Sequence, residues 1–498
     1  MVIYFLYIML FSILISQTPN NKLYVTMQMT DQVAIINTET NQIESIISIE
    51  MQENNNLNCM DYMMEMECNM ASGCEWMMGM CMESSDQDCM DYTMEMECDM
   101  ASECEWMMGM CMENMNMNDI NTPHYIVMDE TLGYWFVTTI ASGYIAQYSL
   151  VDNQYIDSYF VGDAPAILTI DVENQKLYCS RMMPMSGMGN MMPESESRVI
   201  QALKYSAMGL EMAQIPEYEI DSPAPHGIVI NDDGTEIFTA SNTTDWLYKI
   251  DVQTEIINGV SMGSGNPADQ VIQRLKPIQC LSINDKLFIT CSAGSWYNPF
   301  TGENSIIPGQ LQMWNSNTMQ LLDVLEFGDF TGPWHIKEST VDNIIYIALS
   351  GDNLYDTEGL AAVRYENNSL NLEWITNDSS FDTLHGVDTS YDSQNIYVSG
   401  RGDGNIYIFS NDGQHINTIS LGSMTMLGGI ASTKGYIPEF GDSNNSMIID
   451  VVDIVNVVNH ILNGMMFSPY ELYASDCNQD QIIDISDIIM IVNIILSF

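Results

Sequence analysis

The sequence is short of positive charge. It has 13 lysine and arginine residues against 67 aspartate and glutamate residues, which gives a net charge of −54 over 498 residues. Nucleic acids and anionic membrane surfaces are bound through basic patches, so this composition argues against both kinds of partner. It suits a cation-rich extracellular setting in which divalent cations bind the acidic surface, although solubility in salty water explains the charge at least as well.

Familiar catalytic motifs are also missing. The chain has no Gly-x-Ser-x-Gly nucleophile motif, no Walker loop for phosphate and no His-Glu-x-x-His zinc motif. Asp232 and Asp233 are adjacent, but they lie in an Asn-Asp-Asp-Gly run that is typical of a hairpin turn. The Arg-Gly-Asp-Gly run at 401–404 likewise predicts a tight turn. Whether the protein is an enzyme therefore stays open.

Long hydrophobic runs are absent apart from residues 2–16, VIYFLYIMLFSILIS. This run is short for a membrane span and lies at the very N-terminus, so it predicts a secretory signal peptide over 1–17. It carries no lysine or arginine, and an uncleaved anchor is the alternative. We expect a secreted or cell-surface protein with no membrane insertion after signal removal.

Short alternating strands separated by Gly/Asp/Asn turns recur along the chain. The clearest example is LHGVDTSYDSQNIYVSGRGDGNIYIF at 384–409. A four-strand unit repeated every 40–60 residues predicts a mainly β fold, a seven-bladed β-propeller. The first blade falls in 18–50 and the others in 121–436, and the strand at 427–435 supplies the missing inner strand of the first blade. The blades begin near 22, 122, 163, 222, 264, 329 and 379, and six or eight blades are the alternatives.

The first blade carries a family resemblance. Residues 23–26 read LYVT and residues 33–41 read VAIINTETN. This resembles the YVTN family of propeller repeats, which implies the propeller fold and says little about chemistry. Some propellers of this type bind a metal in the central channel and open lactone rings, so the resemblance leaves a lactonase-like hydrolase open.

Residues 51–120 interrupt the propeller with a duplicated Cys/Met-rich segment. Both copies space their cysteines identically, and each is too small to fold on a core of its own. We expect two disulfides in each copy, with three possible connectivities. The eight cysteines are Cys59, Cys68, Cys74, Cys81, Cys89, Cys98, Cys104 and Cys111.

The C-terminal segment, 440–498, contains two Asp/Asn-rich loops, each followed by an apolar helical pattern. The loops begin at Asp442 and Asp476 and resemble the two calcium loops of a type I dockerin. That resemblance implies calcium as a cofactor and a cohesin-like protein as partner. The sixth loop position, usually Gly, holds Met447 and Gln481, and a helical hairpin without calcium is the alternative. The residues expected to bind calcium are Asp442, Asn444, Ser446, Asp450, Asp453, Asp476, Asn478, Asp480, Asp484 and Asp487.

Four of the six histidines occupy what the sequence predicts to be the same place in four blades, at the start of the innermost strand. They are His124, His226, His335 and His385. Four imidazoles at one mouth of the channel suit copper, zinc or iron, and the Met-rich run at 182–192 offers thioethers for Cu(I). Structural or ligand-contacting histidines, with a Met-rich loop that binds no metal, are the alternative.

These features together predict an exported propeller that binds a ligand not identifiable from the sequence. Its dockerin-like segment would attach it to a cell-surface or extracellular assembly. Because dockerins are associated with polysaccharide-degrading complexes, the resemblance implies a link to polysaccharide catabolism. The alternative is a copper-binding or copper-dependent redox protein that uses the channel-mouth histidines and the Met-rich loops.

Overall fold

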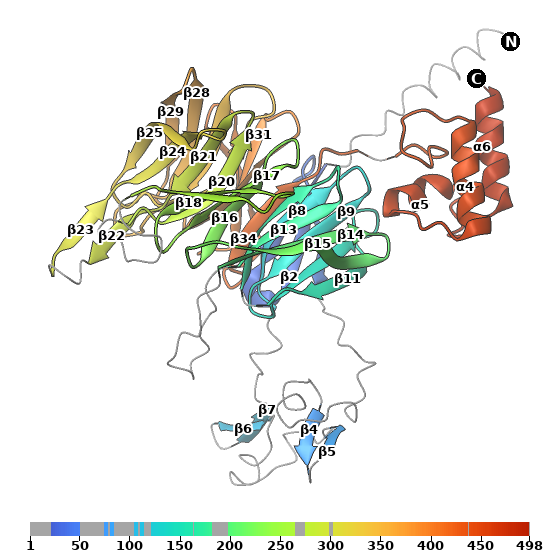
Figure 1. Cartoon of the computed structure of the whole chain (residues 1–498), viewed down its shortest axis with the longest axis horizontal. Coiled ribbons are helices and arrows are strands. Elements are labelled where there is room, and N and C mark those ends of the chain that lie inside the picture. The colour runs from blue at the N-terminus through green and yellow to red at the C-terminus, as the bar shows by residue number, and fades with distance from the viewer. Residues whose placement is uncertain are drawn as a thin grey trace. The chain divides into compact units, whose positions relative to one another are not determined.

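A computed structural model of the whole chain describes the propeller and the C-terminal segment in detail (Figure 1). The chain divides into two compact units, 1–49 with 122–498 and 50–121. No described helix is long and apolar enough to cross a membrane. The described residues are 21–49, 121–162, 164–181, 198–263, 274–297, 302–436, 438–497 and, as backbone only, four short strands between 74 and 113.

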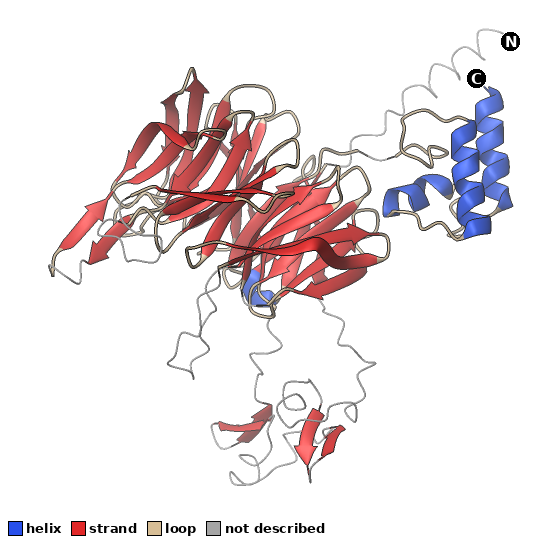
Figure 2. Cartoon of the chain, viewed as in Figure 1, coloured by secondary structure: helices blue, strands red, loops and turns tan. Residues whose placement is uncertain are grey.

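Seven four-stranded antiparallel sheets account for most of the described part of 21–436 (Figure 2). From inside to outside, the first blade consists of β34 (Leu427–Ser432), β1 (Lys22–Met27), β2 (Gln32–Asn37) and β3 (Gln42–Ser48). The second consists of β8 (Pro123–Asp129), β9 (Tyr134–Thr139), β10 (Tyr144–Ser149) and β11 (Tyr155–Phe160). The third consists of β12 (Pro165–Asp171), β13 (Lys176–Arg181), β14 (Val199–Ser206) and β15 (Gly209–Glu219).

The fourth and fifth blades are β16 (Pro225–Ile230), β17 (Glu236–Ser241), β18 (Trp246–Asp251) and β19 (Ile257–Ser261); and β20 (Pro277–Ile283), β21 (Lys286–Cys291), β24 (Gly309–Asn315) and β25 (Gln320–Gly328). The last two are β26 (Pro333–Glu338), β27 (Ile344–Leu349), β28 (Gly359–Glu366) and β29 (Ser369–Asn377); and β30 (Leu384–Thr389), β31 (Asn395–Gly400), β32 (Asn405–Ser410) and β33 (His415–Ser420). The seven-bladed propeller is thus confirmed, including the irregular fifth blade, which carries an extra hairpin of β22 (Gly294–Tyr297) and β23 (Asn304–Ile307).

The ring closes as the sequence predicts. Strand β34 pairs with β1, with Leu23 opposite Ser432 and Val25 opposite Ile430. The inner strands then contact one another in the order β34, β8, β12, β16, β20, β26, β30 and back to β34. Joining the two ends of the ring leaves no open edge between the first and last blades.

Apolar side chains between neighbouring blades form the core. Between the third and fourth blades, for example, the rings of Tyr178 and Tyr248 are buried with Ala166 and Ile228 in one cluster. The strands are rich in β-branched and aromatic residues, which favour a pleated surface buried on both faces. This packing fixes the inner strands and therefore the side chains at the channel.

Every inner strand begins in the same way. The residue before it has a left-handed backbone, and a β-bulge follows within the first four residues of the strand. A bulge changes the direction in which side chains point, so consecutive residues at the strand start can both face the channel. The left-handed residues are Thr122, Ala164, Ala224, Lys276, Gly332, Thr383 and Met426.

The C-terminal segment forms three helices, α4 (Val451–Asn463), α5 (Pro469–Ser475) and α6 (Ile485–Ser497). Asp450 caps α4 and Ser468 caps α5, each in a capping box. Val457 and Ile491 pack between α4 and α6 with Cys477. The loop-helix pattern was predicted, whereas α5 was not, because seven residues are too few for a helical periodicity.

The Cys/Met-rich segment is a separate unit. Each copy contains one two-stranded hairpin, β4 (Cys74–Met77) with β5 (Met80–Glu83) and β6 (Cys104–Met107) with β7 (Met110–Glu113), in identical register. The predicted disulfides and the signal peptide lie outside the described side chains. The cysteines that are described, Cys179, Cys280, Cys291 and Cys477, are buried free thiols.

Candidate functional site

The first C-terminal loop is closed by two carboxylates. Asp442 accepts hydrogen bonds from the backbone N–H groups of Ser446 (2.9 Å) and Met447 (2.7 Å). Asp453, on the first turn of α4, accepts from Asn444 (3.2 Å) and Asp450 (2.8 Å). The first and twelfth residues of the loop therefore fold toward the same stretch of backbone.

The second loop repeats this arrangement. Asp476 accepts from the N–H groups of Asp480 (3.1 Å) and Gln481 (2.9 Å). Asp487, on α6, accepts from Asn478 (3.3 Å) and Asp484 (3.0 Å). Two segments that start 34 positions apart thus share one hydrogen-bond pattern. Their sixth residues, Met447 and Gln481, have left-handed φ angles of 65° and 67°, which is where a calcium loop normally has Gly.

The charge of this segment fits a cation. Residues 440–498 contain eight acidic residues and no lysine or arginine. Asp453 and Asp487 are fully buried, and burial together with the charges of Asp442 and Asp450 raises the pKa of Asp453. An ion bound in the loop would lower this cost, because carboxylate, amide and carbonyl oxygens are the ligands that calcium prefers.

The two loops differ at the fifth position. In the first loop the hydroxyl of Ser446 donates to the backbone oxygen of Ile448 (3.1 Å), whereas in the second the carboxylate of Asp480 accepts from the N–H of Ile482 (2.9 Å). Within the described residues no three His, Cys, Asp or Glu side chains are arranged around one point for a metal ion. A calcium ion would therefore also need oxygens from Asn444, Asn478 and the backbone.

The histidines do gather at the channel, with one correction. His124, His226 and His385 are each the second residue of an inner strand. In β26 that place belongs to Trp334, and His335 is one residue further along. The prediction that all four share one place is therefore wrong for His335, although the bulge still brings its ring to the cluster.

Three imidazoles and one indole are in contact at this mouth of the channel. The ring centroids of His335 and His385 are 4.6 Å apart, and those of His124 and His385 are 5.6 Å apart. The Trp334 ring lies 5.3 Å from His385 and 6.3 Å from His226. All four histidines are at least 96% buried. We refer to His124, His335, His385, Trp334 and Arg401 as the mouth cluster.

Burial keeps these imidazoles neutral. It lowers the pKa of His124 and of His385 well below the usual range, and the charge of Arg401 acts in the same direction on both. Burial, with smaller effects from His226 and Arg401, lowers the pKa of His335 to about 3. Among the described residues, no carboxylate contributes to these pKa shifts. The charged groups that do contribute are all basic, so they disfavour protonation of the three imidazoles.

Hydrogen bonds account for some of the ring nitrogens and leave others free. The side-chain amide of Gln28, on the short helix η1 (Gln28–Thr30), lies 2.5 Å from Nδ1 of His124, and Nδ1 of His226 donates to the backbone oxygen of Ile278 (2.7 Å). Nε2 of His124, Nε2 of His335 and Nδ1 of His385 are buried without a described partner. Nε1 of Trp334 and Nη1 of Arg401 are also buried without a described hydrogen-bond partner.

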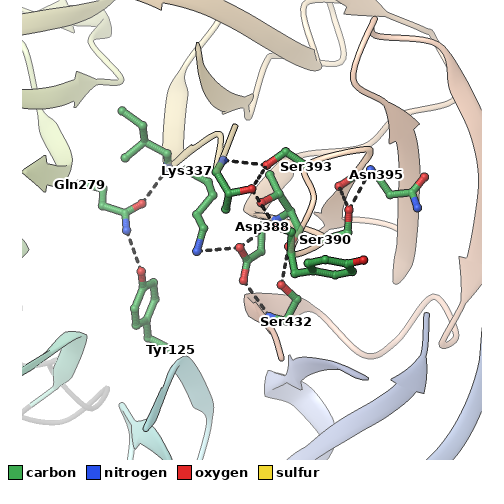
Figure 3. A network of polar contacts seen from close by, with 12 residues as sticks. Tyr125, Gln279, Lys337, Asp388, Ser390, Ser393, Asn395 and Ser432 are labelled. Carbon is green, nitrogen blue, oxygen red and sulfur yellow. Dashed lines mark hydrogen bonds and ion pairs between the residues drawn. The ribbon is translucent and has the colours of Figure 1, made fainter. Parts of the chain in front are cut away.

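Beneath the mouth, a polar network crosses the channel (Figure 3). The amide of Gln279 on β20 donates to the hydroxyl of Tyr125 on β8 (2.7 Å), which joins two blades on opposite sides of the ring. Lys337 forms an ion pair with Asp388 (2.8 Å), which also accepts from the N–H of Ser432 (2.7 Å). Burial is the largest single effect and lowers the pKa of Lys337, but the charge and hydrogen bond of Asp388, with smaller effects of Tyr125 and Glu338, together outweigh it, so the pKa is raised.

Sequence reasoning missed Arg401, Trp334 and Gln28. Arg401 begins the turn between β31 and β32, and Gln28 follows β1. Trp334 lies in β26, one residue before the histidine that the sequence pattern selects. The connections between second and third strands lie on the face where the inner strands begin, and this rule could have placed both residues there. The Met-rich run at 182–192 lies outside the described residues.

Comparison with known proteins shows the fold. No family model matches the chain, and no curated protein matches it. A protein described as a candidate 6-phosphogluconolactonase of Bacteroides fragilis has 10% identity and a TM-score of 0.52, and the match covers 84% of this chain and 99% of that one. One from Bacteroides uniformis has 8% identity, a TM-score of 0.52 and coverage of 84% and 100%. A Lactobacillus plantarum protein has 10% identity and a TM-score of 0.51, and the match covers 84% of this chain and 100% of that one. The chain is therefore a seven-bladed propeller that resembles propellers of the lactonase and YVTN type.

Proposed function

We propose that the protein is an exported, ligand-binding propeller that is attached to a cell-surface or extracellular assembly through its calcium-binding C-terminal segment. The observation that supports this most is the matched pair of loops, each closed by a buried twelfth-position carboxylate. Unrelated acidic loops would have no reason to repeat one hydrogen-bond pattern, whereas two calcium loops require it. The resemblance to dockerins supplies the cohesin-like partner and the link to polysaccharide degradation.

The surface of the C-terminal helices also supports docking. The tenth position of each loop, at the start of α4 and α6, holds Val451 and Ile485, which are 64% and 70% exposed. Val452, Val455 and Ile489 extend this apolar surface along the same two helices. Exposed aliphatic residues on a pair of helices favour a protein partner over solvent. Calcium would act here by holding both helices in the geometry that presents these residues.

Calorimetric titration of the full chain with calcium tests the proposal. We expect about two ions per chain, since each loop supplies one set of oxygen ligands. A double variant, Asp453→Asn with Asp487→Asn, should lose this binding because it removes the charge that closes each loop. Asp412→Asn, on an exposed turn of the seventh blade, is the matched control and should bind like the original chain. Unchanged binding in the double variant would refute calcium binding at these loops.

A copper-binding or copper-dependent redox protein is the second candidate. The observation in its favour is the contact among three neutral imidazoles whose ring nitrogens lack a described partner, since neutral imidazole is the form that binds copper. These described side chains do not surround one point as a bound metal would require, so copper binding would need the rings to move. Elemental analysis of the secreted protein and of a His226→Ala, His385→Ala variant tests it. Copper near one per chain, lost in the variant, would support this function, and calcium alone would refute it. A lactonase-like hydrolase stays a prediction, because the similarity to candidate lactonases reaches only the fold.

A further inference from the structure

We propose that the mouth cluster is a binding site for a small organic carboxylate. The inference rests on the proposed role of the propeller as the ligand-binding part of the chain and names the class of its ligand. It starts from five buried nitrogen atoms that have no partner in the described structure: Nε2 of His124, Nε2 of His335, Nδ1 of His385, Nε1 of Trp334 and Nη1 of Arg401.

At least three of these nitrogens are donors. The indole N–H of Trp334 and the guanidinium of Arg401 can only donate hydrogen bonds. The amide nitrogen of Gln28 donates to Nδ1 of His124, which assigns the proton of that ring to Nε2. Buried donors without acceptors cost free energy, so a site that collects several of them is suited to a ligand that brings acceptors.

The charge of the cluster selects an anion. Arg401 has no ion pair among the described residues, and burial alone lowers its pKa. This is unusual in a chain with 67 acidic residues, where a carboxylate partner would be easy to supply. Its positive charge opposes a metal cation at the three imidazoles and favours a negative ligand. A carboxylate can accept both from a guanidinium fork and from neighbouring ring N–H groups.

Aromatic and polar groups border the cluster. The hydrogen bond between Gln279 and Tyr125 spans the channel (Figure 3). The Tyr125 ring packs 5.4 Å from His335, and the Trp334 ring borders His385. These aromatic faces can contact the non-ionic part of a ligand, such as the ring of a sugar acid, while its carboxylate meets the nitrogens.

Calorimetry on the full chain with calcium present tests this inference. The probes are acetate, D-gluconate and D-galacturonate, with D-galactose as the neutral counterpart of galacturonate and inorganic phosphate as the other oxyanion. We expect at least one carboxylate to bind and galactose to bind at least about tenfold more weakly than galacturonate. Phosphate should compete poorly, because it has no apolar part to contact the rings of Tyr125 and Trp334. Failure of all three carboxylates, equal binding of galactose and galacturonate, or tighter binding of phosphate would each overturn the proposal.

Two variants locate the site. Arg401→Ala should weaken binding of the carboxylate at least about tenfold, because a charged hydrogen-bond donor is lost. Its matched control is Arg364→Ala, which removes an exposed arginine paired with Glu373 at 2.7 Å and should change nothing. If Arg401→Ala does not fold, Trp334→Phe keeps an aromatic ring, removes one donor and should weaken binding several-fold. Unchanged affinity in the folded variants would overturn the assignment.

The same samples separate this inference from the proposed function. A chain that binds about two calcium ions but no carboxylate would refute the carboxylate site and leave the docking segment standing. A chain that binds carboxylate but no calcium would refute the docking half of the proposed function and leave the mouth cluster standing. Copper that binds the original chain and binds Arg401→Ala no better would overturn the argument that Arg401 selects an anion.

Discussion

The C-terminal loops and the mouth cluster bring together opposite kinds of groups. In the loops, carboxylates converge in a segment that has no lysine or arginine. At the mouth, nitrogen donors converge, and no carboxylate is among the groups that shift their pKa values in the described structure. The overall charge of −54 predicts the first site but not the second. The sign of a ligand is therefore set by the groups within a few ångströms, not by the net charge.

Calcium removal should separate the two regions most completely. With a chelator, we expect α4 and α6 to lose their helical structure, because ionised carboxylates such as Asp453 and Asp487 would remain buried without a cation. The propeller should stay folded, since its core contains no part of the loops. Far-ultraviolet circular dichroism would show helix loss, and near-ultraviolet signals of the buried aromatic residues would be retained. Helical content that does not change with chelator would contradict a calcium-dependent fold.

Acid should act on the propeller through the buried histidines. Because burial lowers their pKa values, the folded state holds them neutral while the unfolded chain binds protons below its pKa of about 6.5. Stability is therefore lost as the pH falls below that value, by about 1.6 kcal/mol between pH 6.5 and 5 for each of His124, His335 and His385. Urea unfolding at pH 7 and pH 5 measures the difference.

A variant assigns this acid effect to the cluster. His385→Gln should reduce the change in the free energy of unfolding between pH 7 and pH 5 by about the contribution of one histidine. His415→Gln is the control, because His415 is exposed on β33 and lies outside the cluster. A pH dependence that is the same in all three proteins would contradict the assignment.

Much of the fold and one of the two sites could be predicted from local patterns. Strand alternation and turn residues repeat in each blade, and the missing inner strand of the first blade requires the closing strand at 427–432. The two C-terminal loops are contiguous in sequence, so their spacing alone identifies Asp442, Asp453, Asp476 and Asp487 as the carboxylates of a proposed calcium site. The hydrogen bonds of these residues then follow from the loop geometry.

The mouth cluster could be predicted only in part because its members are distant in sequence. A periodic pattern places His124 and His385, but Trp334 holds the matching position in β26, and His335 reaches the cluster only because of the β-bulge at the strand start. Arg401 belongs to a turn that the sequence identifies correctly as a turn. Which way its side chain points depends on burial and on neighbours from other blades, and these are not visible in a local pattern.

Reversing one charge should convert the mouth from one kind of site to the other. Arg401→Glu puts a carboxylate beside three neutral imidazoles, a ligand set that suits zinc or copper. We expect carboxylate binding to fall about a hundredfold or more, and zinc binding to exceed that of the original chain. Calorimetry with galacturonate and with zinc measures both. Galacturonate binding that survives the substitution would show that Arg401 does not select the anion.

The smallest expected effect concerns the left-handed residues of the calcium loops. Met447 and Gln481 have φ angles of 65° and 67°, a conformation that costs a residue with a β-carbon about 1 kcal/mol and costs Gly almost nothing. The carboxylates of Asp442 and Asp476 impose it, because each accepts the N–H of the strained residue. Met447→Gly and Gln481→Gly should therefore each raise the thermal stability of the C-terminal helices and tighten calcium binding several-fold.

Asn445→Gly provides the control for this prediction. Asn445 is also left-handed, at a φ of 54°, but an asparagine tolerates that conformation with less strain, and its side chain donates to the backbone oxygen of Thr131 (2.7 Å) and accepts from the hydroxyl of Tyr436, so Gly should bring no gain there. Equal gains at Met447 and Asn445 would mean that Gly stabilises the loop in a way unrelated to relief at the sixth position. If neither sixth-position variant tightens calcium binding, the loop shape is not what limits affinity. The smaller ligand charge at Ser446, compared with Asp480, would then be the cause of any difference between the two loops.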